Sequence, residues 1–255
     1  MEQENLLSSV SNAIKILRAF KMDRPQKGVR ELAGELGIGK SSVQRILATL
    51  ASEGLVRKNE ESNKYELGLS VLELSSIVLG HIDLHNEALP IITKVANTFK
   101  ETSHIAILDN FEVVYLCKVE SEDSVKLVSH SGLHNYPHCT SSGKLLLAYS
   151  EPYFVETILK NELKKFTSNT IHDPEAFRKE LKAIRQKGYS LSIGELRPEV
   201  HSISAPLRDY TGKVIAAINV VGPRSRLSKQ RMEYIARELI HFGELISERL
   251  GYRKR

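Results

Sequence analysis

Three histidines and a cysteine lie close enough in the sequence to suggest a metal site. His130, His134 and His138 follow one another at intervals of four residues, and Cys139 comes directly after the last. On a helix this spacing would align donors of the kind that zinc accepts. The intervening stretch 131–137, however, contains Gly, Asn and Pro and is typical of a loop, so the helical spacing does not apply. The sequence therefore predicts no metal site.

The same stretch holds the side-chain types of a nucleophilic centre. Cys139 or Ser142 could attack a substrate, with His138 as the base. The sequence places no carboxylate nearby to orient that base, and it contains neither a Walker-type phosphate loop nor a dinucleotide fingerprint. We therefore predict that the protein is not an enzyme, has no catalytic residue and needs no cofactor. A small catalytic or metal-binding domain in the second half of the chain is the alternative.

A different set of polar residues follows a glycine-containing turn, Gly37-Ile38-Gly39. Before this turn Val29 and Leu32 begin an apolar pattern at intervals of three and four residues, and after it Val43 and Leu47 resume the pattern. This periodicity predicts a helix, a tight turn and a second helix. The second helix keeps several polar residues off its apolar stripe near its N-terminal end, where a recognition helix meets base edges and phosphates. These residues are Lys40, Ser41, Ser42, Gln44 and Arg45.

Two short strands are expected directly after the second helix. The chain leaves that helix at Gly54, and residues 55–57 and 64–67 flank a polar tip, which predicts a hairpin, the wing of a winged helix-turn-helix. Arg57, Lys58 and Lys64 lie in or beside this hairpin and are candidates for phosphate contacts. The alternatives are an ordinary pair of packed helices and a protein-interaction module with no DNA role.

Composition bounds these hypotheses without deciding between them. The net charge of +5 and the pI near 9.1 are compatible with an anionic partner, but the excess is too modest to diagnose nucleic acid. The two cysteines, Cys117 and Cys139, are too few for a disulfide framework and fit a reducing compartment. No basic-then-apolar leader and no long apolar run is present, so we expect a cytoplasmic protein without membrane contact.

The order and spacing of several short blocks along nearly the whole chain resemble the IclR-type bacterial transcription regulators. This resemblance implies an N-terminal winged domain, a linker helix and a C-terminal ligand-sensing domain of GAF-like type. It further implies a homodimer, or a dimer of dimers, on a palindromic operator in double-stranded DNA, with repression as the expected mode. The blocks that carry the resemblance are residues 9–20, 31–56, 65–69, 72–74, 137–140, 143–144, 203–206 and 222–224.

The resemblance also carries effector-binding positions onto this chain. They are Ser141, Ser142, Ser192, Ser202 and Asn219. Many family members have a run of acidic residues after the position of Gly188 and Tyr189, and in this chain only Glu195 keeps the acidic character. Val221 stands where family members often have a serine. A pocket lined by hydroxyl and amide groups supplies fixed hydrogen bonds without a counter-charge, so it favours a small polar organic acid or a sugar derivative. The alternative is that each serine only caps a helix or ends a strand.

The length of 255 residues and the 41% hydrophobic content favour two domains, each with its own core. We assign residues 1–67 to the winged domain, 68–83 to the linker helix and 84–255 to an α+β ligand-sensing domain. Residues 69–82 are apolar over most of the helical circumference, so this helix should be buried, either against a second subunit or inside one larger domain.

In the winged domain, Ser11 or Asn12 should cap the first helix. Further helices are expected over residues 84–100, 140–150, 152–159, 173–188 and 228–250, and strands over 104–109, 113–119, 124–129, 190–193, 201–208 and 214–221.

Overall fold

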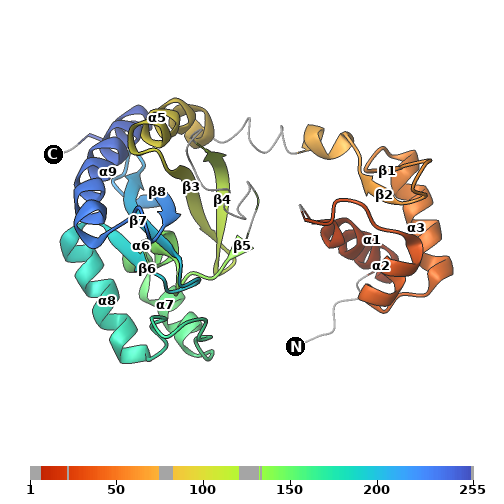
Figure 1. The fold of residues 1–255 in the computed structure, drawn as a ribbon, viewed down its shortest axis with the longest axis horizontal. Helices are drawn as coiled ribbons and strands as arrows, with labels where there is room; N and C mark the ends of the chain where they lie inside the picture. Colours follow the sequence, from red (N-terminus) through yellow and green to blue (C-terminus); the bar gives the residue numbers. More distant parts are fainter. Residues whose placement is uncertain (1–6, 22, 75–82, 121–131, 133, 254–255) are drawn as a thin grey trace. The chain divides into compact units, whose positions relative to one another are not determined.

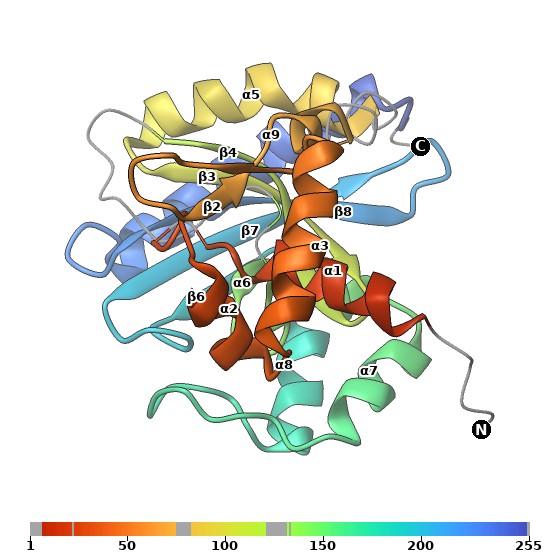
Figure 2. The same ribbon diagram turned by 90° about the vertical axis from the view of Figure 1, so that its right-hand side faces the viewer.

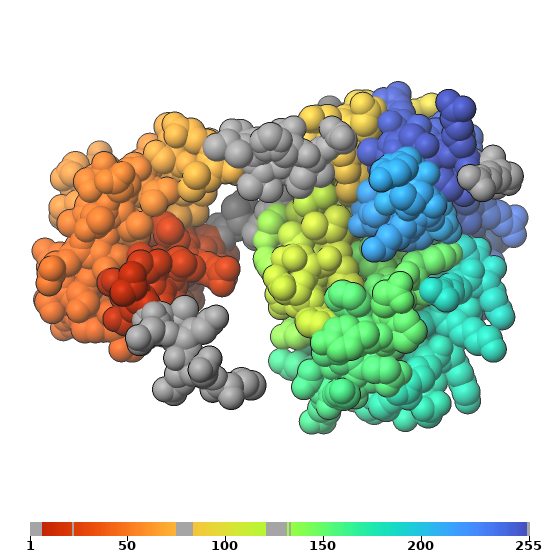
Figure 3. Space-filling view, turned by 180° about the vertical axis from the view of Figure 1, so that it is seen from behind, coloured from red at the N-terminus to blue at the C-terminus, as the bar shows by residue number. Residues whose placement is uncertain are grey.

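The computed structural model describes residues 7–21, 23–74, 83–120, 132 and 134–253. The chain divides into two compact units, Met1–His81 and Ile82–Arg255. In Figure 3 the first unit is coloured red to orange and the second yellow to blue. The elements of each unit are labelled in Figure 1.

The first unit is built on three helices that all contact one another, α1 (Ser8–Ala19), α2 (Val29–Leu36) and α3 (Lys40–Ser52) (Figure 2). Their apolar stripes supply the buried core, which includes Ile16, Leu32 and Leu47. Gly37 ends α2 with a φ of 66°, in the left-handed region that favours glycine. The predicted helix, turn and helix are therefore confirmed.

The first helix begins earlier than expected. The prediction that Ser11 or Asn12 caps it is wrong, because α1 starts at Ser8 and the Ser11 backbone N–H donates to the Leu7 carbonyl over 3.0 Å. An N-cap is worth only about 1 kcal/mol, so it does not stop a helix that gains backbone hydrogen bonds by growing one more turn.

The wing is a two-stranded antiparallel sheet of β1 (Val56–Lys58) and β2 (Tyr65–Leu67). Lys27 extends it, because its backbone N–H and carbonyl pair with Tyr65 at 2.9 and 2.8 Å. Residues 70–74 then begin a helix, whereas residues 75–82 of the expected linker helix lie outside the described residues.

The second unit contains a six-stranded antiparallel sheet in the order β5-β4-β3-β8-β7-β6. Helices α5 and α9 pack on one face, and α6 contacts the other face and packs against α8 (Figure 1). The strands are β3 (Thr102–Asp109), β4 (Glu112–Val119), β5 (His134–Asn135), β6 (Ser190–Ile193), β7 (Val200–Arg208) and β8 (Val214–Pro223). The helices are α5 (Asp83–Phe99), α6 (Ser141–Tyr149), α7 (Pro152–Leu159), α8 (Pro174–Lys187) and α9 (Lys229–Arg249).

The central strands turn apolar and polar residues to opposite faces. Ile105, Ile203 and Ile218 are buried against the α5 and α9 side of the sheet. Because side chains alternate along a strand, their neighbours His104, Ser202, Ser204 and Asn219 face the side that α6 covers. The sheet thus brings polar groups under the first turn of α6.

The elements expected over the described residues of this unit are present within a few residues of their predicted ends. Thr140 caps α6 and Asp173 caps α8 through side-chain hydrogen bonds, and Gly188 ends α8 with a φ of 78°. The strand expected over residues 124–129 lies outside the described residues.

Candidate functional site

The N-terminal half of α3 presents the polar face that was expected of a recognition helix. Lys40, Ser41, Ser42, Gln44 and Arg45 are all exposed, while Val43 and Leu47 between them are buried in the core. Within the described part of the chain, none of the five polar side chains hydrogen-bonds or pairs with another protein group. Each is therefore available to a partner.

The wing cations differ from one another in their surroundings. Arg57 lies opposite Glu66 on the neighbouring strand, and its Nε donates to Glu66 Oε1. Gln26 also donates to Glu66 over 2.8 Å, and the Gln26 and Arg57 hydrogen bonds together lower the pKa of that carboxyl. Lys58 and Lys64 are exposed at the hairpin. Arg57 is thus held by a carboxylate, which the sequence pattern did not indicate.

Four of the five predicted effector positions meet in one hydrogen-bonded group. We call Ser141, Ser142, Ser202, Ser204 and Asn219 the hydroxyl cluster. Ser141, in the first turn of α6, donates to Ser202 and lies 2.8 Å from both Ser202 Oγ and Ser204 Oγ. Asn219 Nδ2 donates to Ser141 over 3.1 Å, and Ser142 lies 3.1 Å from Ser204. Every one of these side chains is buried.

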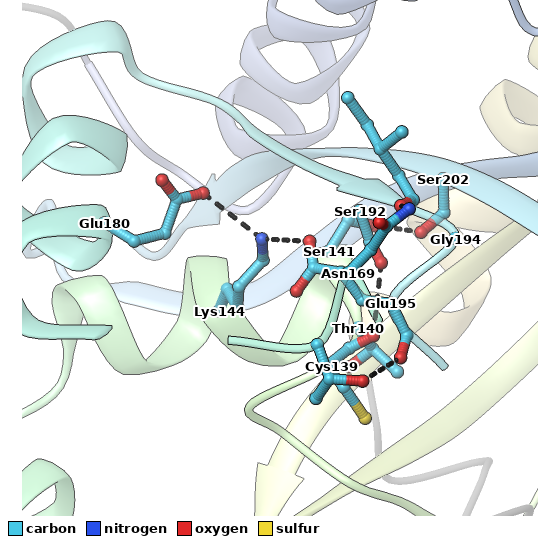
Figure 4. A network of polar contacts seen from close by, with 12 residues as sticks. Cys139, Thr140, Ser141, Lys144, Asn169, Glu180, Ser192, Gly194, Glu195 and Ser202 are labelled. Atoms are coloured by element: carbon cyan, nitrogen blue, oxygen red, sulfur yellow. Dashed lines mark hydrogen bonds and ion pairs between the residues drawn. The ribbon is translucent and has the colours of Figure 1, made fainter. Parts of the chain in front are cut away.

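The sheet register explains why these residues meet. Asn219 of β8 is directly opposite His104 of β3 on one side and Ser204 of β7 on the other. Ser204 is in turn opposite Ser190 of β6, and Ser192, the fifth predicted position, is opposite Ser202. Ser192 donates to the Cys139 carbonyl over 3.1 Å, so it anchors the segment before α6 beside the hydroxyl cluster (Figure 4).

His104 stabilises the hydroxyl cluster from the side of β3. Its Nδ1 lies 3.1 Å from Asn219 Oδ1, and its ring stacks on Tyr115 with centroids 4.7 Å apart. Burial lowers the pKa of His104 to about 4 and raises the pKa of Tyr115 to about 12, so both are neutral near pH 7. Because an amide oxygen only accepts, His104 Nδ1 carries the proton and orients the Asn219 amide toward Ser141.

A buried ion pair lies next to the hydroxyl cluster. Lys144 of α6 donates to Glu195 Oε1 over 2.6 Å and to Glu180 Oε1 of α8 over 3.2 Å (Figure 4). Burial raises the pKa of Glu195, while Lys144 opposes that change. The residue types at the predicted effector positions had indicated neutral surroundings. The structure instead places a buried ion pair beside them.

Gly143 is small for a reason other than ligand access. A Cβ atom there would lie 2.3 Å from Pro137 Cα, so the backbone of α6 packs directly on that residue. The Gly143 N–H is also already bonded to Thr140 Oγ1 over 3.2 Å. The Gly143 N–H is therefore already paired within the protein.

The histidines of the possible metal or catalytic site turn to separate partners. His134 pairs with Glu112 over 2.8 Å, His138 Nε2 lies 2.9 Å from the Lys164 carbonyl, and His130 lies outside the described residues. Burial raises the pKa of Cys139 to about 12, which leaves it a protonated and poor nucleophile. Among the described residues no group of three or more His, Cys, Asp or Glu side chains could hold a metal.

Sequence reasoning missed three residues of this site, namely His104, Ser204 and Lys144. A signal existed for Ser204, because it follows Ser202 by two residues and must share its strand face. No comparable local signal exists for His104, whose partner Asn219 is 115 residues away in the sequence.

Comparison with known proteins assigns both halves of the chain to the IclR family. Residues 9–60 match the family described as the IclR helix-turn-helix domain, and residues 76–248 match the family described as the bacterial transcriptional regulator IclR C-terminal domain. The HTH-type transcriptional regulator KdgR of Escherichia coli is 33% identical over 254 residues, which cover 98% of this chain and 95% of that protein. The E. coli regulator XynR is 28% identical over 97% of this chain and 98% of its own length.

Solved structures show the same likeness in three dimensions. The IclR protein of Thermotoga maritima is similar with a TM-score of 0.80 and 28% identity, over 96% of this chain and 99% of that chain. An IclR homologue from Microbacterium hydrocarbonoxydans, solved in complex with 4-hydroxybenzoate, has a TM-score of 0.84 and 26% identity over 95% of this chain and 99% of its own. Within the residues that the structure describes, no helix has the length and apolar character needed to span a bilayer.

Proposed function

The chain belongs to the IclR family of bacterial transcriptional regulators, and from this premise we propose how its two units divide the reading of DNA and the sensing of a metabolite. The protein is a DNA-binding regulator controlled by a small molecule, and it is not an enzyme. We assign DNA recognition to residues 1–67, effector binding to residues 84–255 and coupling to the helix over residues 68–83.

The exposed face of α3 supports the assignment of DNA recognition. Its N-terminal half carries Lys40, Ser41, Ser42, Gln44 and Arg45 without protein partners, which is the part of a recognition helix that enters the major groove. Gln44 and Arg45 have the side chains best suited to paired hydrogen bonds with base edges. The remaining cations, Arg57, Lys58 and Lys64, would contact phosphates from the wing.

Fluorescence polarisation tests this function directly. The full chain is titrated onto DNA from upstream of its own gene and onto a scrambled duplex at near-physiological salt, and we expect a preference of about a thousandfold. Arg45→Ala should abolish most of that preference, whereas Lys182→Ala, which removes an exposed charge from α8, should leave it unchanged. Equal affinity of the Arg45→Ala and parent proteins for the upstream duplex would overturn the assignment of α3.

The hydroxyl cluster, together with Ser192, supports the assignment of effector binding. These groups converge under the first turn of α6 and offer hydroxyl and amide hydrogen bonds in a buried setting, which suits a small organic acid or a sugar derivative. The relative solved with 4-hydroxybenzoate also holds a carboxylic acid, although an aromatic one. A bound acid would replace hydrogen bonds that the serines now make with one another.

A panel of organic acids and sugar acids, added to the DNA-bound protein, tests this assignment. We expect one class to change DNA affinity in the parent protein and to lose its effect in Ser141→Val and Asn219→Leu. An effect that survives both substitutions would place the effector elsewhere.

The apolar residues exposed on the first unit support a homodimer, or a dimer of dimers, that binds a palindromic operator. Val10 and Ile14 are exposed on α1, and Leu69, Leu72 and Leu74 are exposed after the wing. Large apolar side chains that lie together on a surface often mark a protein–protein interface. A dimer with twofold symmetry would place two α3 helices on two half-sites, and an effector that favours one dimer arrangement would change their spacing. We expect the protein to act as a repressor in the cytoplasm, where its DNA target is.

A further inference from the structure

A pocket bounded by the Lys144 ion pair lies between α6, α8, β6 and α9. Its volume is about 550 Å³, within the range of sites for small molecules. It is lined by Lys144 of α6, by Glu180 and Lys187 of α8, by Leu191 and Ile193 of β6 and by Lys229 of α9, among others. No member of the hydroxyl cluster lines it.

The buried end of this pocket carries an excess of negative charge. Lys144 is placed against two carboxylates, 2.6 Å from Glu195 Oε1 and 3.2 Å from Glu180 Oε1 (Figure 4). The side chains of Lys144 and Glu195 are only 1% and 7% exposed, so water screens them weakly, whereas Glu180 is 31% exposed and is screened more. One ammonium group balances one carboxylate, and the second carboxylate remains uncompensated within this group of three.

One carboxylate oxygen of Glu195 lacks a hydrogen-bond partner. Its Oε2 atom is buried and has no hydrogen-bond partner among the residues that the structure describes. Burial raises the pKa of Glu195, and the charge and the hydrogen bond of Lys144 act against that rise. A buried acceptor without a donor is costly. The site therefore lacks one donor and one positive charge at the same place.

The walls and the mouth of the pocket have a different character. Ile184 and Leu191 give it apolar walls, the exposed cations Lys187 and Lys229 line it as well, and the half-buried carboxylate of Glu233 balances one of these two cations. The pocket thus combines the two carboxylates around Lys144 with aliphatic surface and with a group of two ammonium groups and one carboxylate, which has a net positive charge.

We propose that this pocket is a second ligand site and binds an α-amino acid with an aliphatic side chain. The ligand's ammonium group lies against Glu180 and Glu195, its carboxylate faces Lys187 and Lys229, and its side chain packs on the aliphatic walls. The ligand supplies the missing donor and positive charge at the buried end, and its own negative charge is met at the mouth.

Calorimetric titration of the full chain with three compounds of related carbon skeleton tests the proposal. L-Leucine carries both charged groups, 4-methylpentanoate lacks the ammonium group and 3-methylbutylamine lacks the carboxylate. We expect saturable binding of L-leucine, and at least about tenfold weaker binding of each analogue, because each leaves one charged partner unmet. Absence of saturable L-leucine binding, or binding of the acid as tight as that of the amino acid, overturns the proposal.

Substitutions locate the site. Glu180→Gln and Lys229→Ala should each weaken L-leucine binding about tenfold, because both residues are partly or fully exposed and can change without emptying the core. Lys182→Ala, on the same helix as Glu180 but outside the pocket, is the matched control and should bind as the parent does. Asn219→Leu disrupts the hydroxyl cluster and should also leave L-leucine binding unchanged. Loss of binding in Asn219→Leu would instead put the amino acid in the proposed effector site and overturn the second site alone.

Discussion

Nδ1 of His104 lies 3.1 Å from Oδ1 of Asn219, and the two residues are directly opposite each other on β3 and β8. This contact decides which end of the Asn219 amide faces Ser141. It requires a proton on Nδ1, and burial keeps the ring neutral by lowering the pKa of His104 to about 4, although the Asn219 hydrogen bond acts in the opposite direction. The geometry of the hydroxyl cluster therefore depends on a side chain that contacts only one of its members.

The burial of His104 predicts a loss of stability in mild acid. The unfolded chain takes up a proton on His104 near its ordinary pKa of 6.5, whereas the folded chain does so only near 4. The free energy of unfolding should thus fall by about 3 kcal/mol between pH 6.5 and pH 4 through this residue. The charge of Lys118 lowers the pKa of His104 and the charge of Glu120 raises it, and both effects are smaller than that of burial.

Urea unfolding across this pH range measures the effect. His104→Asn removes the titrating group and should flatten the pH dependence relative to the parent protein. His241→Gln, at an exposed position of α9, should retain the parent's slope. An identical slope in parent and His104→Asn would mean that His104 does not resist protonation in the folded state.

The pairing of Arg57 with Glu66 predicts a gain of DNA affinity when the carboxylate is removed. Glu66→Gln releases the Arg57 guanidinium and deletes a negative charge from the wing. Binding to any duplex should tighten, and the fall of log K with log salt should steepen by up to about one unit, the value of one further phosphate contact. Salt titrations on the scrambled duplex measure this slope. A slope equal to that of the parent would exclude Arg57 from phosphate contact.

The intact Lys144–Glu195 pair should add little to the free energy of unfolding, whereas removing only one partner should lower that free energy strongly. Lys144→Met leaves a buried carboxylate without its cation and should reduce the free energy of unfolding by about 3–5 kcal/mol. The double variant Lys144→Met/Glu195→Leu should regain most of that loss, because it removes both buried charges. Arg178→Met, which breaks exposed pairs with Glu156 of α7 and Glu175 of α8, should destabilise the protein far less than Lys144→Met does. Additive losses in the double variant would contradict this coupling.

The exposed apolar residues of the first unit predict the surface of the proposed dimer. Ile14→Asp combined with Leu72→Asp puts charge on that surface and should shift the mass measured by light scattering toward the monomer. DNA affinity should fall with it, because two half-sites then bind independently. Tyr210→Asp, at an exposed turn of the second unit, should change neither quantity. A dimer mass for the Ile14→Asp/Leu72→Asp variant would place the interface elsewhere.

The helices of the first unit could be predicted because the signals for them are local. Val43 and Leu47 lie one turn apart on α3, and the glycine at 37 has the left-handed backbone that ends α2. The start of α1 was missed, since a weak capping preference competes with hydrogen bonds of the extra turn. The ends of a helix are decided by contributions of similar free energy, such as a cap and one further turn. A sequence pattern does not show which contribution is larger.

The sequence by itself determined the alternation that puts Ser202 and Ser204 on one strand face, and through the family resemblance it identified the polar positions to examine. Only the tertiary structure decided that Asn219 meets His104 and that Ser141 meets Ser202, 61 residues away. It also decided that Lys144 is buried between Glu180 and Glu195. These contacts depend on how the strands are aligned with one another and on where α6 packs, and both are decided by burying the complete apolar face of the sheet. Periodicity in the sequence specifies only which side of its own helix or strand each residue occupies.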